Sequence, residues 1–232
     1  PTVIPGKADV MALLQAADAL ANVKNQTIAR PWQRYRPMLY LAADSGMRPQ
    51  EYLALARTAV EDHGVRVERA VDGSGKEISV TKTPAGRRFI ELSAETLDMV
   101  RSYGDNHGIK TDHNLVFPAA NGRWLCRRNW QRRGFNVACE KAGLMETVEQ
   151  GGKTIERPKY RPYDLRHFFA SMLIENKVNL KKIQTLMGHT NIETTLNVYG
   201  HLLDDDTSER QDVGLIGNLR QNSCGKSVAE AV

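Results

Sequence analysis

One stretch, from residue 160 to residue 201, constrains the fold more than any other: YRPYDLRHFFASMLIENKVNLKKIQTLMGHTNIETTLNVYGH. Apolar side chains recur in it at i, i+3, i+4, i+7 and i+8 from Leu165, the spacing of one apolar face of a helix. This helix is expected to open near Pro162 and to carry Arg166 and His167. Residues able to do chemistry therefore lie beside a helical face that packs against other elements.

Two short helices are predicted to follow in the same stretch. The first runs from about Asn179, a suitable N-cap, to Gly188, a natural C-terminal stop. The second begins near residue 190 or 191 and ends at Gly200.

Arg166, His189 and Tyr199 thus belong to three consecutive elements that can converge. Each has an ordinary structural explanation when taken alone: a tyrosine near a helix end packs against its neighbours, and a Gly-His pair between helices forms a cap and a turn. Two short helices joined by a glycine-containing turn also fit a helix-turn-helix that only binds DNA.

The order R-H-F-F-A-S, L-M-G-H-T and T-L-N-V-Y resembles the C-terminal half of the phage integrase, or tyrosine recombinase, catalytic domain. The resemblance covers roughly residues 7–201. It implies a mainly α-helical domain with a small antiparallel β-sheet (α+β). It also implies that Tyr199 attacks a DNA phosphate, that Arg166 holds this phosphate and that His189 assists.

A second arginine stands in the sequence G-M-R-P-Q-E. Pro49 suits the first position of a helix, so Arg48 lies at or just before a helix N-terminus, where backbone donors favour a phosphate. The resemblance implies that Arg48 is the first catalytic arginine and that Glu51 orients it. A surface Arg–Glu pair is the structural alternative. His167, next to Arg166, is expected to be a buried supporting residue.

Between residues 65 and 92 the periodicity changes to two-residue alternation, punctuated by Gly and Pro, which predicts three antiparallel strands with tight turns. Lys82 follows the second of them. The resemblance implies that this lysine is the general acid, which protonates the leaving 5′ oxygen from the minor groove.

Apolar spacing predicts four more helices, over residues 7–23, 31–45, 93–103 and 127–142. The last is basic, and residues 145–160 follow it as an irregular segment or a hairpin around Gly151-Gly152. Backbone phosphate contacts, which give affinity without sequence reading, are expected from Arg87, Arg128, Arg132, Arg133 and Lys159.

The sequence departs from the family pattern at Tyr163. The family most often has a histidine three residues before the second arginine, and this histidine is commonly assigned as the general base. A phenol with a pKa of about 10 accepts a proton poorly near pH 7. Tyr163 is therefore expected to position the phosphate as a catalytic residue, with His189 or water left to accept the proton.

The charge of the chain suits a polyanionic partner. The net charge is +5, from 32 Lys and Arg against 27 Asp and Glu, and the basic residues gather between residues 110 and 190, while residues 201–232 are acidic on balance. A merely solubilising role is the alternative explanation. No apolar run approaches the ~18 residues of a membrane span.

The three cysteines and six histidines show no spacing that suits a metal site or a disulfide framework. Because the two arginines are expected to neutralise the phosphate, the implied reaction needs no metal ion. The phosphotyrosine bond keeps the energy for rejoining, so no ATP or other cofactor is expected. Reduced thiols agree with the expected location, the cytoplasm of a bacterial host.

Three segments are expected. Residues 1–6 are predicted to be a linker from a missing N-terminal DNA-binding domain, and residues 7–203 the catalytic domain. Residues 204–232 are predicted to form a partly helical tail that docks on a neighbouring protomer. The protein is expected to be a monomer when free and a homotetramer on paired sites of double-stranded DNA.

The resulting prediction is a site-specific recombinase of a phage or mobile element, which cuts and rejoins DNA through a 3′-phosphotyrosine intermediate. Two alternatives stay open. One is a nicking and closing enzyme like the type IB topoisomerases, and the other is a non-catalytic DNA-binding protein of the same fold.

Overall fold

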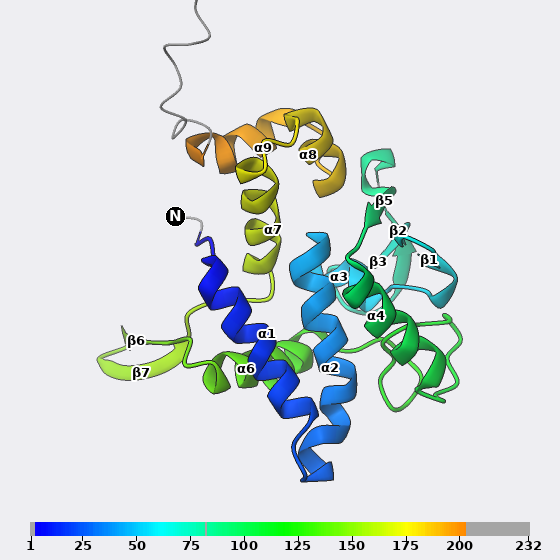
Figure 1. Ribbon diagram of the computed structural model, residues 1–232, viewed down its shortest axis with the longest axis vertical. Coiled ribbons are helices and arrows are strands. Elements are labelled where there is room, and N and C mark those ends of the chain that lie inside the picture. Colours follow the sequence, from blue (N-terminus) through cyan, green and yellow to red (C-terminus); the bar gives the residue numbers. More distant parts are fainter. Residues whose placement is uncertain (1–2, 82, 203–232) are drawn as a thin grey trace, which may run out of the picture.

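The computed structural model describes residues 3–81 and 83–202. Lys82, the expected general acid, lies outside the described residues. The tail from residue 204 onward, which was expected to dock on a neighbouring protomer, lies outside them too. The fold is mainly α-helical with small antiparallel sheets, as predicted (Figure 1). In the part of the chain that the structure describes, no helix is long and apolar enough to cross a bilayer.

The first two helices, α1 (Lys7–Ala21) and α2 (Gln26–Ser45), pack against each other. The predicted start of α2 at Pro31 is wrong by five residues. The Asn25 side chain accepts a hydrogen bond from the Thr27 amide at 3.0 Å and begins the helix earlier, so that Pro31 and Pro37 both lie inside it. The end is as predicted, with Gly46 in the left-handed conformation at φ 60°.

The strands between residues 60 and 91 form two small sheets, and the prediction of three strands between residues 65 and 92 is wrong. Strands β1 (Val60–Glu61), β2 (Gly64–Val67) and β5 (Arg88–Glu91) form one antiparallel sheet, in the order β1-β2-β5. Strand β3 (Arg69–Val71) pairs instead with β4 (Ile78–Val80).

The pairing changes because the chain between β4 and β5 runs through a 3-10 turn at Pro84–Gly86. Strand β4 therefore does not join the sheet that contains β5. After Val67, which pairs with Arg88, the next paired residue is Arg69, whose partner is Val80. One predicted strand therefore becomes two strands with different partners.

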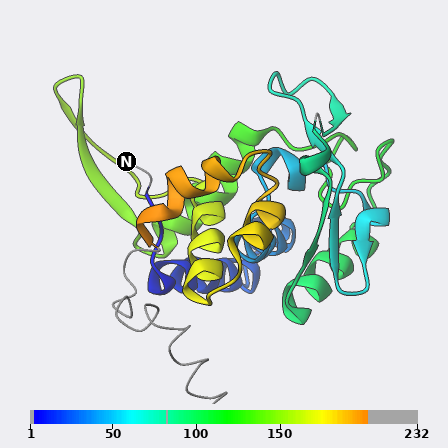
Figure 2. The same ribbon diagram turned by 90° about the horizontal axis from the view of Figure 1, so that it is seen from above.

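The middle of the chain supplies α3 (Pro49–Leu53), a 3-10 turn at Arg57–Ala59 and α4 (Ala94–Asn106), which is capped by Ser93 as predicted. The predicted basic helix runs through α5 (Arg127–Trp130), a π-helical segment (Gln131–Phe135) and α6 (Asn136–Lys141). A hairpin of β6 (Met145–Gln150) and β7 (Lys153–Pro158) follows, turns at Gly151-Gly152 and projects from the body (Figure 2).

The C-terminal helices are α7 (Asp164–Glu175), α8 (Leu180–Met187) and α9 (Ile192–Tyr199), followed by a 3-10 turn at Gly200–Leu202. Their predicted caps, Asn179 and Gly188, are in place. The three helices gather at one end of the molecule (Figure 1) around a small core of their own, formed by Ala170, Ile174, Ile183, Met187 and Tyr199.

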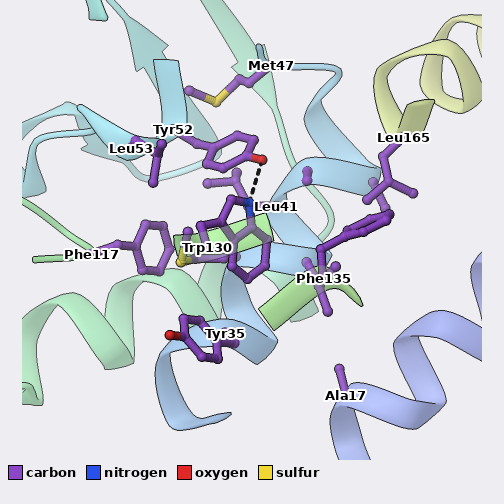
Figure 3. Packing of buried hydrophobic residues seen from close by; sticks show 14 of the residues in the cluster. Ala17, Tyr35, Leu41, Met47, Tyr52, Leu53, Phe117, Trp130, Phe135 and Leu165 are labelled. Carbon is purple, nitrogen blue, oxygen red and sulfur yellow. Dashed lines mark hydrogen bonds between the residues drawn. The ribbon is translucent and has the colours of Figure 1, made fainter. Parts of the chain in front are cut away.

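The main core is centred on Trp130, which is fully buried (Figure 3). Its indole N–H donates to the Tyr52 hydroxyl at 3.0 Å, and its ring lies 5.4 Å from that of Tyr35. This bond gives the indole N–H and the phenol oxygen a partner in an apolar interior. The core thereby joins α2, α3 and the basic helix, on which the N-terminal part of the site rests.

Gly134 in the π-helical segment gives a test of this packing. A Cβ atom there would lie 2.3 Å from Trp130 Cζ3 and 3.2 Å from Tyr35 Cγ. We expect Gly134→Ala to lower the free energy of unfolding by about 1–3 kcal/mol through overpacking. The matched control is Gly104→Ala in α4, where the new Cβ meets nothing closer than 3.4 Å.

Gly104→Ala is expected to be neutral or to stabilise by up to about 1 kcal/mol, since alanine favours a helix. Urea denaturation of both variants measures the difference. Equal stability of the two would contradict the packing described around Trp130.

Candidate active site

The end of helix α8 binds three arginines that come from distant parts of the chain. The carbonyl oxygens of residues 186, 187 and 188 accept, in that order, from Arg88 Nε at 2.6 Å, from Arg166 Nη2 and from Arg48 Nη2 at 3.1 Å. The last carbonyls of a helix lack partners within the helix and carry partial negative charge. They therefore hold three guanidinium groups close together.

Arg166 is buried on α7, with 1% of its surface exposed. Its Nη1 donates to the Gly46 carbonyl at 2.6 Å, and its Nη2 lies 3.0 Å from His189 Nε2. Burial first, and then the charge of Arg48, lower the pKa of Arg166 to about 10. The group therefore stays positively charged at neutral pH.

Glu51 binds both the side chain and the backbone of Arg48. The carboxylate accepts from the Arg48 backbone N–H at 2.7 Å and from Arg48 Nη1 at 2.9 Å. Arg48 is itself the N-cap of α3, with Pro49 at the first helical position. Its side chain keeps 32% of its surface exposed, so the guanidinium stays accessible to a ligand.

Arg88 is the residue that the sequence reasoning missed. It is buried on β5 and donates to both carboxylate oxygens of Glu51, at 2.8 and 3.1 Å. A signal was present, because two-residue alternation puts Arg88 on the same face as the buried Ile90. Arg87, which the sequence singled out instead, is exposed.

Glu51 is the buried counterion of this group. Burial acts to raise the pKa of its carboxyl, but the hydrogen bonds and charge of Arg88, together with the charge of Arg48, outweigh it and leave the pKa below its ordinary value. The carboxylate is thus ionised at neutral pH and offsets part of the charge of the arginines.

His189 follows α8 directly, and both of its ring nitrogens have partners. An arginine can only donate, so Nε2 accepts from Arg166, and Nδ1 carries the proton toward Thr195 Oγ1 at 2.9 Å. Burial and the nearby arginines lower the pKa of His189 to about 4. Gln184 fixes the loop by donating to the His189 carbonyl at 3.1 Å.

The Tyr199 side chain is buried at the end of α9, with 2% of its surface exposed. Its hydroxyl lies 2.8 Å from His167 Nδ1. Burial raises the pKa of the phenol, and the charge of Arg166 opposes this rise. Tyr163 is 41% exposed, and its ring lies 5.3 Å from the His167 ring.

An open cleft of about 680 Å³ lies beside these groups. Arg48 and His189 line it, together with residues of β3 and β4 and with the residues that lead from α8 into α9. Tyr199 belongs instead to the core of the C-terminal helices. The cleft thus offers cationic and hydrogen-bonding groups to an anion, whereas the phenol of Tyr199 is buried and does not line it.

The other residues singled out in the sequence lie apart from this group. Arg128, Arg132 and Arg133 are exposed on the basic helix. Lys159 is exposed and forms an ion pair with Asp9 at 3.0 Å. Within residues 3–81 and 83–202, no three His, Cys, Asp or Glu side chains are grouped so that they could hold a metal ion.

Comparison with known proteins adds three findings. Residues 7–206 match the phage integrase family. The chain is 29% identical over 186 residues to the tyrosine recombinase XerC of Proteus mirabilis, an alignment that covers 80% of this chain and 53% of that protein. The chain thus spans about half the length of the curated relatives it matches.

Two solved structures have the same fold. The Tn1549 transposon integrase superposes with a TM-score of 0.66 at 23% identity, over 86% of this chain and 61% of that one. The catalytic domain of bacteriophage HP1 integrase superposes with a TM-score of 0.54 at 19% identity, over 94% of this chain and 98% of that one.

Removal of Arg88 tests the role of the buried ion pair. Arg88→Met leaves the Glu51 carboxylate buried beside one partly exposed arginine, so we expect a loss of about 3–5 kcal/mol in the free energy of unfolding at neutral pH. Without Arg88 the pKa of Glu51 rises. The loss should therefore shrink as the pH falls through the raised pKa of Glu51 in the variant toward its lowered pKa in the wild type.

Denaturation at neutral pH and near pH 4 measures both effects. The matched control is Arg66→Met, which removes an exposed pair with Glu61 next to β5 and should cost only about 0–1 kcal/mol. A loss for Arg88→Met no greater than that of the control would contradict the importance of the buried pair.

Proposed function

The chain belongs to the phage integrase family, and we propose that it is the catalytic part of a site-specific DNA recombinase, an enzyme that cuts and rejoins DNA strands through a 3′-phosphotyrosine intermediate. The observation that carries the proposal is the convergence of Arg48, Arg166 and His189 at the end of α8, with Tyr199 on the next helix. Arg48 and His189 line an open cleft, and the buried Arg166 contacts His189, an arrangement that suits one phosphodiester.

In the proposed reaction, Arg48 and Arg166 bind the non-bridging oxygens of the scissile phosphate. Both guanidinium groups are charged and held in place, so they stabilise the additional negative charge of the pentavalent transition state without reorganisation. His189, neutral at pH 7, completes the binding site for the phosphate. No metal ion is assigned to this reaction, because the arginines neutralise the phosphate. No ATP is assigned, because the phosphotyrosine bond keeps the energy needed for rejoining.

Tyr199 is the proposed nucleophile. Its phenol is buried and its pKa is raised, so it must leave the apolar core and approach the arginines before it attacks. Positive charge there favours the phenolate. Movement of α9 on DNA binding is therefore part of the proposal, and Tyr163, exposed beside His167, is assigned to position the phosphate.

Double-stranded DNA is the proposed partner. The solved Tn1549 transposon integrase is in complex with a circular intermediate DNA. The exposed arginines 87, 128, 132 and 133 are assigned to the DNA backbone. Lys159 is assigned there too and would exchange its ion pair with Asp9 for a phosphate.

The domain organisation and assembly are proposed by the same reasoning. We assign residues 1–6 to a linker from an N-terminal DNA-binding domain, residues 7–203 to the catalytic domain and residues 204–232 to a tail that docks on a neighbouring protomer. The protein is proposed to be monomeric when free and tetrameric on paired sites, in the cytoplasm of a bacterial host of a phage or mobile element.

Covalent capture tests the proposal and needs no defined target sequence. The protein is incubated with a pool of nicked duplexes that have a randomised central segment, and DNA that stays bound in detergent is recovered and sequenced. We expect one sequence class to be captured, and Tyr199→Phe to abolish capture while DNA binding persists, because the variant lacks only the attacking oxygen.

Three other results would contradict this expectation. Capture without sequence preference favours a nicking and closing enzyme. DNA binding without any capture favours a non-catalytic protein. An adduct retained in Tyr199→Phe assigns the nucleophile to another residue.

Lys82 is the proposed general acid for the leaving 5′ oxygen. We expect Lys82→Ala to slow adduct formation by about 10²–10⁴-fold on ordinary DNA. A substrate with sulfur at the bridging 5′ position has a better leaving group that needs no proton, so it should restore the rate. Single-turnover rates on the two substrates measure the effect, and a variant equally slow on both would remove the acid role.

A further inference from the structure

We infer that His167 is the general base that accepts the Tyr199 proton, an inference that rests on the proposed function and fills the role left open by Tyr163. In the described part of the chain, the hydroxyl of Tyr199 has one side-chain hydrogen-bond partner, His167 Nδ1 at 2.8 Å. A base must lie within hydrogen-bond reach of the proton it removes, and His167 meets this condition in the resting position of Tyr199.

The other two candidates are less suited to the task. Tyr163 is a phenol, and a phenol with an ordinary pKa of about 10 accepts a proton poorly. His189 already uses Nε2 to accept from Arg166 and Nδ1 to contact Thr195. A proton on Nε2 of His189 would break its bond to Arg166, which the phosphate site needs.

The position of His167 in the fold suits a base. It follows Arg166 on α7 and lies within range of the charge of that arginine, so the movement proposed for α9 does not take its ring away from the phosphate site. Its side chain also lines an open cavity of about 540 Å³, through which a proton can pass to solvent. Asp164, one turn earlier on the same helix, lines this cavity as well.

This places Tyr199, His167 and Asp164 in the order of nucleophile, base and neighbouring carboxylate. Burial lowers the pKa of His167, the Asp164 carboxylate raises it, and Arg166 lowers it. The net effect is a pKa below the ordinary value, so the imidazole is unprotonated and can accept a proton at pH 7. Other charged or titratable groups around the ring are Tyr163, Tyr199 and His189, and those that line the cavity, Glu146, Arg157, Lys159, Tyr160 and Arg161.

The proposed step moves two protons and exchanges one bond at phosphorus for another. The Tyr199 O–H proton moves to His167 Nδ1, and the phenolate oxygen forms a bond to phosphorus. The bond from phosphorus to the 5′ oxygen breaks, and that oxygen takes a proton from the acid assigned to Lys82. The products are a 3′-phosphotyrosine, a 5′-hydroxyl and a protonated His167, which returns its proton to the phenolate on rejoining.

The kinetic test uses the 232-residue chain and the nicked duplex that the wild type captures from the randomised pool. The single-turnover rate of adduct formation is measured across about pH 5–8. We expect the wild-type rate to rise with pH through the titration of His167 and then to level off. His167→Asn keeps a hydrogen-bond acceptor but no base, so it should be about 10²–10⁴-fold slower and lose this pH dependence.

The matched control is His63→Asn, which removes an exposed histidine in the turn between β1 and β2 and should keep the wild-type profile. Added imidazole should partly restore His167→Ala. If His167 only holds the resting tyrosine in place, His167→Ala will instead form adduct as fast as the wild type or faster, and the proposal is overturned.

A second measurement needs no variant and no DNA. Nitrogen-15 NMR of the wild-type protein reports which ring nitrogen of His167 carries the proton. The proposal requires the hydrogen on Nε2 and an accepting Nδ1, whereas a proton on Nδ1 would make His167 the donor and exclude it as the base. Absence of any wild-type adduct would count against the proposed function, while the NMR result would still decide the contact itself.

Discussion

The attraction between the carbonyl end of α8 and three guanidinium groups is the interaction on which the rest of the site depends. Arg48 comes from the cap of α3, Arg88 from β5 and Arg166 from α7, and each donates to a different one of three successive carbonyls. The partial negative charge of a helix C-terminus fades beyond its last turn, so it acts only on groups brought this close. The end of α8 therefore sets the relative positions of a loop, a strand and a helix.

The charge of this cluster is unbalanced in a way that suits an anionic ligand. Glu51 offsets part of the charge of Arg48 and Arg88, whereas the Arg166 guanidinium donates to neutral groups, two carbonyls and His189. Buried cations without a full set of counterions are costly, as the lowered pKa of Arg166 reflects. A phosphate between Arg48 and Arg166 would supply the missing negative charge.

Much of this arrangement could be predicted from the sequence because it is local. The apolar spacing after Leu165, the caps Asn179 and Gly188, and the Arg48-Pro49 pair each depend on neighbours a few residues away. The start of α2 and the number of strands between residues 65 and 92 were mispredicted. Apolar spacing placed the start of the helix at Pro31, whereas the Asn25 cap begins it at Gln26, and the loop between β4 and β5 changed the strand pairing.

The sequence by itself determined which segments are helices, the caps at several of their ends, and which side chains face the core, since local periodicity and capping encode these properties. The tertiary structure alone decided that Arg88 pairs with Glu51 and that the Tyr199 hydroxyl meets His167. Periodicity gives the face on which a side chain lies but not the distant group that it meets there. That choice depends on how helices and strands far apart in the chain pack, and on the need of each buried charge and polar atom for a partner.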